Sequence, residues 1–330
     1  MRGIAARQAG AATTRRRQSR HEVRDVTRPL RVGVQLPEVE REVRWPELLD
    51  MARAIEDLGY DAIWVGEHFL SRWPDREPRG PWEAWTLMSA LVAVTDRVTV
   101  GPLVACTNFH NPALLAKQAA TIDEIAGGRF VLGLGAGWNE TEFRAFGFPY
   151  DHRIDRFEEA FTIIRTLLRE GAIDFDGTYY QARDCELLPR SRRGSPKLLI
   201  GSNGPRMLRI AAPHVDAWNT WFADTANSPA GVAPLREMVD AACRDVGRDP
   251  AEIARTVAVQ VRLPGGRGRT MGDTSQADRI RPLDGDPETM AGELRDYAAA
   301  GIAEVQLVLD PIDRAAIERF APVLAILDDD

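Results

Sequence analysis

Short runs of β-branched and apolar residues alternate eight times with longer helical patterns after residue 29, and this rhythm limits the possible folds most strongly. The strand runs show little polar alternation, which is typical of a parallel sheet covered on both faces. Eight strand–helix units close a barrel, and the chain length lies within the usual range of that fold. We therefore predict an α/β protein, a (β/α)8 TIM barrel with loop insertions; a doubly wound open sheet is the alternative. The predicted strands span 31–36, 61–65, 97–105, 130–134, 197–200, 215–218, 256–261 and 304–309, and the helices span 45–58, 82–94, 112–126, 153–169, 206–212, 232–246, 287–300 and 314–327.

The chain divides by charge into a basic start and an acidic body. It has 330 residues with 42 basic and 49 acidic side chains, so its formal charge is −7. Residues 1–28 hold eight arginines against Glu22 and Asp25, which leaves the rest of the chain at −13. We predict that residues 1–29 are an arginine-rich disordered tail and that residues 30–330 form a single barrel domain. Three long connections, 67–80, 171–195 and 264–285, are the predicted insertions.

Composition and charge exclude several function classes. An acidic body is a poor nucleic-acid binder, and no apolar run reaches the roughly 18–20 residues of a membrane span. The arginine-rich start has no apolar stretch behind it, so it does not resemble a secretory signal. Cys106, Cys185 and Cys243 are far apart, which favours reduced thiols in a cytoplasmic protein over a disulfide framework. No HExxH or comparable spacing occurs, so we expect no metal site.

In a TIM barrel the active site lies at the carboxyl ends of the strands, and chemically useful residues follow five of the predicted strands. Glu67 and His68 follow the second strand, and the imidazole can serve as a general acid or base near neutral pH. A lone histidine at a strand end can equally be structural. The other groups that follow strands are 106–110, 135–140, 201–204 and 219–222.

Two glycine-rich stretches suggest a phosphate or a close backbone approach. The stretch 133–137 has the spacing GxGxG and sits fourth in the alternation, so it does not match the dinucleotide fingerprint GxGxxG. Its glycines are compatible with strands that pass close to neighbours. In Gly201-Ser-Asn-Gly-Pro-Arg206, small residues precede a helix start, where free N–H groups and the helix dipole favour an anion. A simple strand–helix turn is the alternative.

The sequence resembles the luciferase-like monooxygenase superfamily, and within it the coenzyme F420-dependent oxidoreductases. The resemblance runs from about Leu30 to Leu327 and is carried by four blocks. The most specific is GRFVLGLGAGWNE (128–140) followed by EFRAFG (142–147). The others are LGYDAIWVGEHF (58–69), KLLIGSNGPRMLRIAAPHVDAWN (197–219) and DYAAAGIAEVQLVL (296–309). The resemblance implies a typically dimeric barrel that holds F420 or FMN with its ring in the barrel mouth.

The family pattern assigns roles to individual positions of this chain. His68, preceded by the acid Glu67, matches the catalytic histidine beside the ring's reactive centre. Leu103 and Val104 fall where the family often has a non-prolyl cis peptide behind the ring. The remaining cofactor-binding residues that we predict are Asn108, Ala136, Trp138, Asn139, Gly201, Ser202, Asn203, Gly204 and Arg206. The aromatic side chains expected in the substrate pocket are Trp73, Phe109, Trp221 and Phe222.

One departure from the family pattern concerns the proton donor. Some F420 enzymes of this family have a glutamate on the first strand, where this chain has Gln35, so Glu67 or His68 would have to supply a proton.

The resemblance implies hydride transfer between F420 and a small organic substrate by a homodimer. One alternative is an FMN-dependent two-component monooxygenase that uses molecular oxygen and a flavin reductase partner. A second alternative is a non-catalytic flavin-binding protein.

Overall fold

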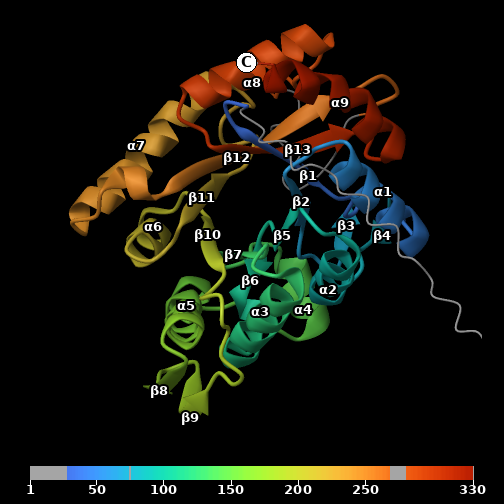
Figure 1. Cartoon of the computed structure of the whole chain (residues 1–330). Helices are drawn as coiled ribbons and strands as arrows, with labels where there is room; N and C mark the ends of the chain where they lie inside the picture. The colour runs from blue at the N-terminus through green and yellow to red at the C-terminus, as the bar shows by residue number, and fades with distance from the viewer. Residues whose placement is uncertain (1–27, 74–75, 268–279, 330) are drawn as a thin grey trace, which may run out of the picture.

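The chain builds one parallel sheet that curves around a central axis (Figure 1). The computed structural model describes residues 28–73, 76–267 and 280–329. The sheet has the strand order β5–β2–β1–β13–β12–β11–β10–β7–β6. Its strands in chain order are β1 (Arg31–Gln35), β2 (Ala62–Val65), β5 (Thr99–Pro102), β6 (Ala105–Cys106), β7 (Val131–Gly135), β10 (Lys197–Gly201), β11 (Ala217–Thr220), β12 (Ala254–Arg262) and β13 (Glu304–Asp310).

The two edge strands of this order, β5 and β6, are consecutive pieces of the predicted third strand. Only Leu103 and Val104 separate them, and the peptide bond between these residues is cis, as the family resemblance implies. β5 pairs with β2 and β6 pairs with β7, while a parallel bridge joins Val100 to Phe130. The third strand therefore joins both ends of the sheet, which confirms the predicted eight-stranded barrel over the open sheet.

Helices cover the outside of the barrel, and every predicted helix is present with its bounds shifted by at most three residues. They are α1 (Trp45–Asp57), α2 (Ala84–Val94), α3 (Pro112–Ala126), α5 (Arg153–Arg169), α6 (Pro205–Ala211), α7 (Pro229–Asp245), α8 (Pro287–Ala299) and α9 (Arg314–Asp328). Local chemistry sets several of their ends. The Asn111 side chain accepts a hydrogen bond from Leu114 N at the start of α3, and Gly127 ends the helix in the left-handed conformation.

The largest apolar cluster of the described residues lies between the sheet and the helices. Smaller clusters lie inside the barrel, one formed by Ala62, Trp64, Leu103 and Leu199 and another by Phe222, Ala258 and Val308. Several other inward positions of the strands are glycine or polar, among them Gly33, Gln35, Asn219 and Gln306. The interior is thus less apolar than the outer core, and it leaves room for a cavity at one end.

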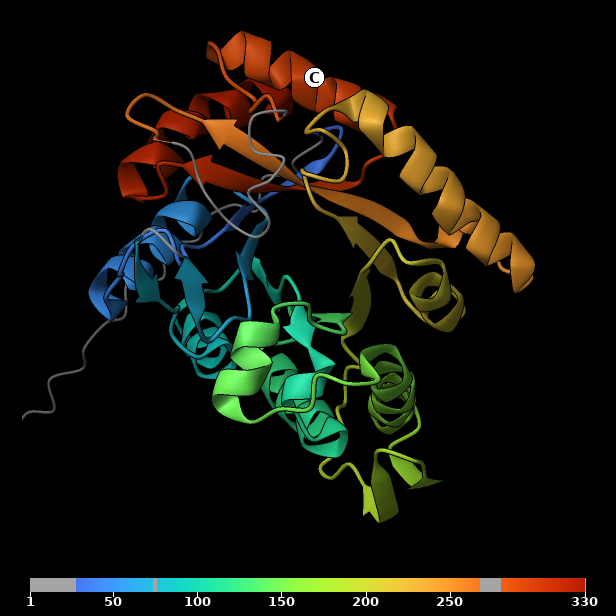
Figure 2. The same cartoon turned by 180° about the vertical axis from the view of Figure 1, so that it is seen from behind.

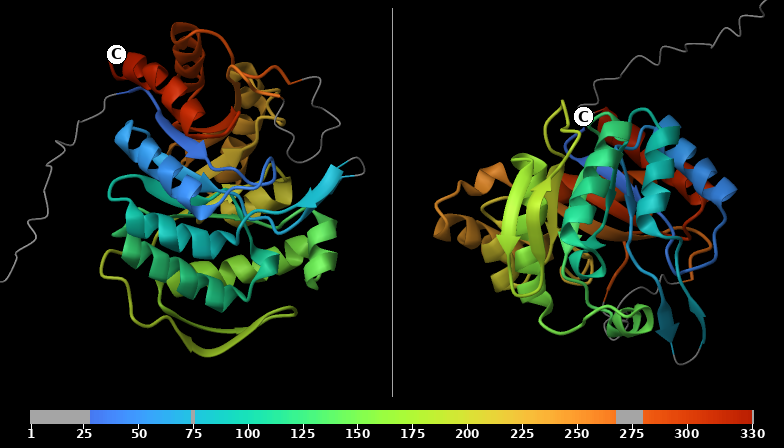
Figure 3. Two further views of the ribbon diagram at one scale, coloured as in Figure 1. Left: turned by 90° about the vertical axis from the view of Figure 1, so that its right-hand side faces the viewer. Right: turned by 90° about the horizontal axis from the view of Figure 1, so that it is seen from below.

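Two hairpins and one short helix are inserted between the strands and helices of the barrel. The hairpin β3 (Ser71–Trp73) and β4 (Arg76–Arg79) follows β2, and the short helix α4 (Glu140–Phe146) follows β7. Both lie at the same end of the barrel, the end that faces the viewer in Figure 2 and points to the right in the left panel of Figure 3. A second hairpin, β8 (Ala172–Asp176) and β9 (Gln181–Glu186), extends away from the barrel beside α5. Part of the third predicted insertion, residues 268–279, lies outside the described residues.

The barrel's contacts begin before residue 30. Arg28, which the sequence assigns to the tail, has a side chain only 3% exposed and pairs with Asp328 at 2.7 Å and Asp61 at 3.3 Å. Its guanidinium also donates to the carbonyl of Gly59 at 3.0 Å. This arginine therefore ties the start of the barrel to its last helix. Residues 1–27 lie outside the described part of the chain. Among the helices in the described ranges, none has the length and apolar content required to cross a bilayer.

Candidate active site

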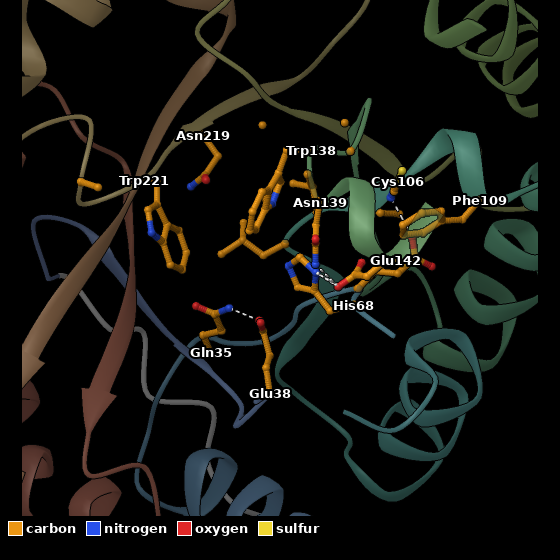
Figure 4. Close-up of a pocket in the computed structure, with 18 of the residues that line it drawn as sticks. Gln35, Glu38, His68, Cys106, Phe109, Trp138, Asn139, Glu142, Asn219 and Trp221 are labelled. Atoms are coloured by element: carbon orange, nitrogen blue, oxygen red, sulfur yellow. Dashed lines mark hydrogen bonds and ion pairs between the residues drawn. The ribbon is translucent and has the colours of Figure 1, made fainter. Parts of the chain in front are cut away.

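A cavity of about 400 Å³ opens at the carboxyl ends of the strands, where the barrel fold puts active sites. Its wall contains nine of the residues predicted from the sequence: Glu67, His68, Leu103, Val104, Phe109, Trp138, Asn139, Gly201 and Trp221. Five further wall residues were named in the sequence analysis without a predicted role in the site: Gln35, Cys106, Gly135, Gly137 and Asn219. The wall residues that the sequence analysis did not name are Glu38, Ala105, Glu142, Ala223 and Asp224. Figure 4 shows these side chains converging from opposite walls of the barrel.

His68 is held by a carboxylate from the inserted helix α4. Its Nδ1 lies 2.9 Å from Glu142 Oε1, and the Glu142 side chain is only 1% exposed. Asn139, which caps α4 through its bond to Thr141 N, donates to the same Glu142 oxygen at 2.8 Å. The other ring nitrogen of His68 points into the cavity in Figure 4, and the ring meets Trp138 edge-on at 5.8 Å.

The environment of His68 favours its charged form. Burial of the ring opposes the charge, but the hydrogen bond to Glu142 and the negative charges of Glu38, Glu142 and Glu67 outweigh it. Together they raise the pKa of His68 to about 9. His68 is therefore an imidazolium at neutral pH, with one N–H bonded to Glu142 and the other available to a ligand.

Glu67 has a different environment from His68, although the two are adjacent in the chain. Its Oε1 accepts from Trp85 Nε1 at 2.7 Å and contacts His110 Nε2 at 2.8 Å, while its Oε2 accepts from Cys106 N at 2.7 Å. Three groups from α2 and from the segment after β6 thus converge on one buried carboxylate. This geometry suits a residue that fixes the cavity wall better than one that exchanges protons with a ligand.

Val104, the second residue of the cis peptide, packs against three glycines of neighbouring strands. A Cβ placed on Gly201 would lie 2.8 Å from Val104 Cγ1, and one on Gly135 would lie 2.9 Å from Cγ2. A Cβ on Gly133 would lie 3.0 Å from Cγ1 and 2.3 Å from the carbonyl of Pro102. The glycines of the GxGxG stretch therefore allow a close approach of the third strand, which is the structural interpretation that the sequence left open.

The predicted anion loop follows β10 but lies beside the cavity. Among its residues only Gly201 belongs to the described cavity wall, while Ser202, Asn203, Gly204 and Arg206 continue toward the surface. Asn203 Nδ2 donates to Thr220 Oγ1 at 3.1 Å and to Asp224 Oδ2 at 2.9 Å. Arg206 pairs with Asp155 at 2.6 Å and Glu158 at 2.9 Å, so an anion at this loop would have to share or replace two carboxylates.

Four other predicted residues lie outside the cavity wall. Trp73 is in the β3 strand of the first hairpin. Phe222 is buried against Ala258 and Val308 inside the barrel, with its ring 4.7 Å from that of Trp221. Asn108 is buried and donates to the carbonyls of Ala136 and Arg153 at 2.9 and 3.1 Å. Asn108 and Ala136 therefore connect the segments after β6 and β7 and do not face the cavity.

The most consequential residue missed by sequence reasoning is Glu142. It lies 74 positions from His68, and only the fold brings the two together. The sequence Asn139-Glu-Thr-Glu142 carries an N-cap followed by acids, a helix-start signal that would have predicted α4. Cys106 was noted only as a reduced thiol; burial, with the charge of Glu67, raises its pKa, so its thiol stays protonated.

Comparison with known proteins agrees with the fold. Residues 29–263 match the family model of luciferase-like monooxygenases. The chain is 35% identical to the pyrimidine monooxygenase RutA of Cronobacter sakazakii over 172 residues, which is 51% of this chain and 50% of that protein. It is 30% identical to the 5,10-methylenetetrahydromethanopterin reductase of Archaeoglobus fulgidus over 207 residues, 63% of this chain and 57% of that protein. The matches thus span about half the length of these curated relatives.

Solved structures share the whole fold. An F420-dependent secondary alcohol dehydrogenase, solved with an F420-acetone adduct, superposes with a TM-score of 0.76 over 90% of this chain and 99% of its own, at 21% identity. A riboflavin lyase solved with a modified FMN superposes with the same score over 91% of each chain, at 16% identity. Because the family model matches most of the sequence, the chain belongs to the luciferase-like monooxygenase family.

Proposed function

We propose that this chain is an oxidoreductase that transfers a hydride between coenzyme F420 and a small organic substrate. The observation that carries this proposal is the His68–Glu142 pair, which holds an imidazolium against the cavity at 2.9 Å from its counter-charge. A cationic acid in a largely apolar cavity suits a reaction in which a substrate gains a hydride and a proton.

The cavity wall fits a planar ring with a phosphate-bearing tail. Leu103 and Val104 form an apolar part of the wall, where three glycines let Val104 approach the neighbouring strands closely. These two residues and Gly135 would hold the ring, and Ser202, Asn203 and Gly204 would contact the phosphate. F420, when bound, supplies a carbon that gives or accepts the hydride. Arg206 would contribute once an anion competes with Asp155 and Glu158.

His68 would move the proton in this reaction. In the direction of substrate reduction, the substrate carbon gains the hydride and its two electrons, and the substrate heteroatom takes the proton from His68 Nε2. The neutral ring, still bonded through Nδ1 to Glu142, would then regain a proton from water. A pKa of about 9 would keep His68 protonated at neutral pH, so that it could donate this proton.

An FMN-dependent monooxygenase is the second candidate, because the chain is 35% identical to a pyrimidine monooxygenase. That function would need molecular oxygen and a flavin reductase partner. A non-catalytic flavin-binding protein would keep the cavity and show no turnover with any electron donor.

Titration of the purified chain with F420 and with FMN distinguishes these functions. The two cofactors differ in absorption and fluorescence, so each affinity is measured separately. We expect F420 to bind and reduced F420 to be consumed anaerobically with a panel of small carbonyl and alkene compounds. Tight FMN binding without F420 binding would overturn the first proposal. Binding of either cofactor without any turnover would favour the non-catalytic alternative.

A further inference from the structure

Two carboxamides in the cavity wall, those of Gln35 and Asn219, donate hydrogen bonds to protein groups through their nitrogens. Gln35 is 1% exposed and its Nε2 donates to Glu38 Oε1, while its Oε1 has no hydrogen-bond donor in the described structure. Asn219 Nδ2 donates to Gln306 Oε1 at 2.8 Å and to Thr256 Oγ1 at 2.9 Å. Both N–H groups of Asn219 Nδ2 and one of the two N–H groups of Gln35 Nε2 are therefore used, and no donor of the described residues bonds to the oxygen of either amide.

A chain of buried hydrogen bonds sets the orientation of the Asn219 amide. Glu304 lies at the opposite end of the barrel interior, and it is surrounded by donors: Trp64 Nε1 at 2.8 Å, Arg31 at 3.6 Å and Gln306 Nε2 at 3.4 Å. Because Gln306 turns its nitrogen toward Glu304, it turns its oxygen toward Asn219. Asn219 must then turn its nitrogen toward Gln306, and its oxygen faces the cavity in Figure 4.

The charged groups elsewhere in the cavity wall include a single cation. Among the described residues that line the cavity, none is lysine or arginine, and the only cation is His68. Gln35 and Asn219 lie on the opposite side of the cavity from His68 and Glu142 (Figure 4). A ligand would therefore meet the charged donor of His68 on one side and the amide oxygens of Gln35 and Asn219, beside the indole of Trp221, on the other.

We propose that Gln35 and Asn219 form a wall that selects uncharged ligand groups with an N–H or O–H donor, and that Gln306 is the positioning residue that fixes this preference. The donor belongs either to the substrate or to the imide N–H of the cofactor ring; the chemistry recognised is the same. A ligand without the donor would leave a buried amide oxygen unpaired, which costs binding free energy. This inference rests on the proposed function in that it takes the same cavity to be the place where the cofactor ring and the substrate bind.

Two matched pairs of probes test the wall on the full-length chain. FMN and 3-methyl-FMN differ by the imide N–H, and 2-piperidone and N-methyl-2-piperidone differ by the lactam N–H. Flavin fluorescence reports the first pair, and ligand-observed NMR with FMN present reports the second. We expect the donor-bearing member of at least one pair to bind about tenfold tighter. Preference within the flavin pair identifies the cofactor as the source of the donor, and preference within the lactam pair identifies the substrate.

Variants distinguish the effect of the hydrogen bonds from Glu304 through Gln306 to Asn219 from the effect of the cavity's shape. Gln306→Met keeps a similar volume and is not in the wall, and it should reduce the ratio of affinities to within about twofold. Thr256→Val removes the other acceptor of Asn219 but leaves Gln306 in place, so the ratio should remain. If Gln306→Met does not fold, the double variant Asn219→Leu/Gln306→Leu replaces both partners of the bond with apolar groups and should also lose the ratio.

The proposal is overturned if wild-type protein binds both members of each pair equally, binds neither donor-bearing probe, or keeps its ratio in Gln306→Met. Because binding is the readout, a chain that selects donors but transfers no hydride would refute the proposed function and leave this inference intact.

Discussion

His68 Nδ1 and Glu142 Oε1 lie 2.9 Å apart although their residues belong to different insertions of the barrel. The carboxylate comes from α4, and Asn139 orients it from the start of the same helix. A residue that the sequence predicts as an acid or base thus depends on a partner that the sequence did not predict. The protonation of His68, and with it the proposed reaction, follows from this pair.

Replacing Glu142 with glutamine should shift the pH profile of turnover. The amide can still accept a hydrogen bond from Nδ1, but it carries no charge, so the pKa of His68 should fall from about 9 by at least about one unit. If His68 donates a proton, substrate reduction declines as pH rises through that pKa, and the decline should move to lower pH in Glu142→Gln. Turnover measured across pH 6–10 and the NMR titration of His68 provide the test. Glu140→Gln, an exposed neighbour on α4, is the control and should leave the profile unchanged.

The same pair should make stability depend on pH in a defined window. The folded pKa of His68, about 9, lies above its unfolded value of 6.5. The stabilisation is therefore complete below pH 6.5 and is lost as pH rises to 9, with a loss of about 3 kcal/mol at most. Urea unfolding at pH 6.5, 7.5 and 9 measures it, and His68→Gln should flatten the curve. An unchanged slope in that variant would contradict the assigned pKa.

His214 should have the opposite effect on the pH dependence of stability, and it should act below pH 6.5. Burial, with the charges of Arg165, Arg169 and Arg248, lowers its pKa to about 4. The fold therefore requires the neutral ring, and stability should rise between pH 4 and 6.5 as the unfolded chain loses its proton. His214→Gln should reduce this rise in the same unfolding series, whereas His68→Gln should not.

The contact between Val104 and Gly201 should be measurable as a coupling free energy. Alanine at Gly201 would place a Cβ 2.8 Å from Val104 Cγ1, so Gly201→Ala should destabilise the chain by about 1–3 kcal/mol and weaken cofactor binding. Val104→Ala in the same chain should restore much of the loss. Gly292→Ala is the control, because Gly292 lies in α8 with open space around it and should gain about 0.5–1 kcal/mol. Equal effects of Gly201→Ala with and without Val104→Ala would refute the contact.

The repeating part of the fold was predictable because its signals are local. The apolar runs and the helix ends at Asn111 and Gly127 depend on a few neighbouring residues, and eight such units leave few arrangements. The hairpin of β3 and β4 was not predicted, since its residues, SRW and REPR, contain charges and a proline in place of β-branched alternation. The break of the third strand at Leu103 and Val104 came only from the family resemblance.

The candidate site was predictable where a residue follows a predicted strand, as His68 and Gly201 do, whereas Val104 was predicted only from the family resemblance. Glu142 and Gln306 were missed, and Asn219 was noted only as part of a group that follows a strand, because their roles depend on partners 74, 87 and 87 positions away, respectively. Gln306 is also fully buried in the middle of a strand, a place where sequence patterns predict an apolar side chain. Contacts such as Asn219–Gln306 and His68–Glu142 can be identified only once the arrangement of the barrel strands is known.

Arg206 gives a final test, of whether the loop after β10 binds the phosphate of the cofactor. Its guanidinium pairs with Asp155 and Glu158, and all three side chains are more than a third exposed, so Arg206→Gln should leave the thermal midpoint of unfolding nearly unchanged. The affinity of the Arg206→Gln variant for FMN should nevertheless fall about tenfold, because a charge-assisted bond to phosphate is lost. Riboflavin, which has the same ring without the phosphate, should bind the variant and the wild type equally.

The control variant is Arg209→Gln, at an exposed position on the same helix, and it should bind both flavins as the wild type does. If Arg206→Gln weakens riboflavin and FMN alike, the residue supports the fold of the loop and does not contact the phosphate.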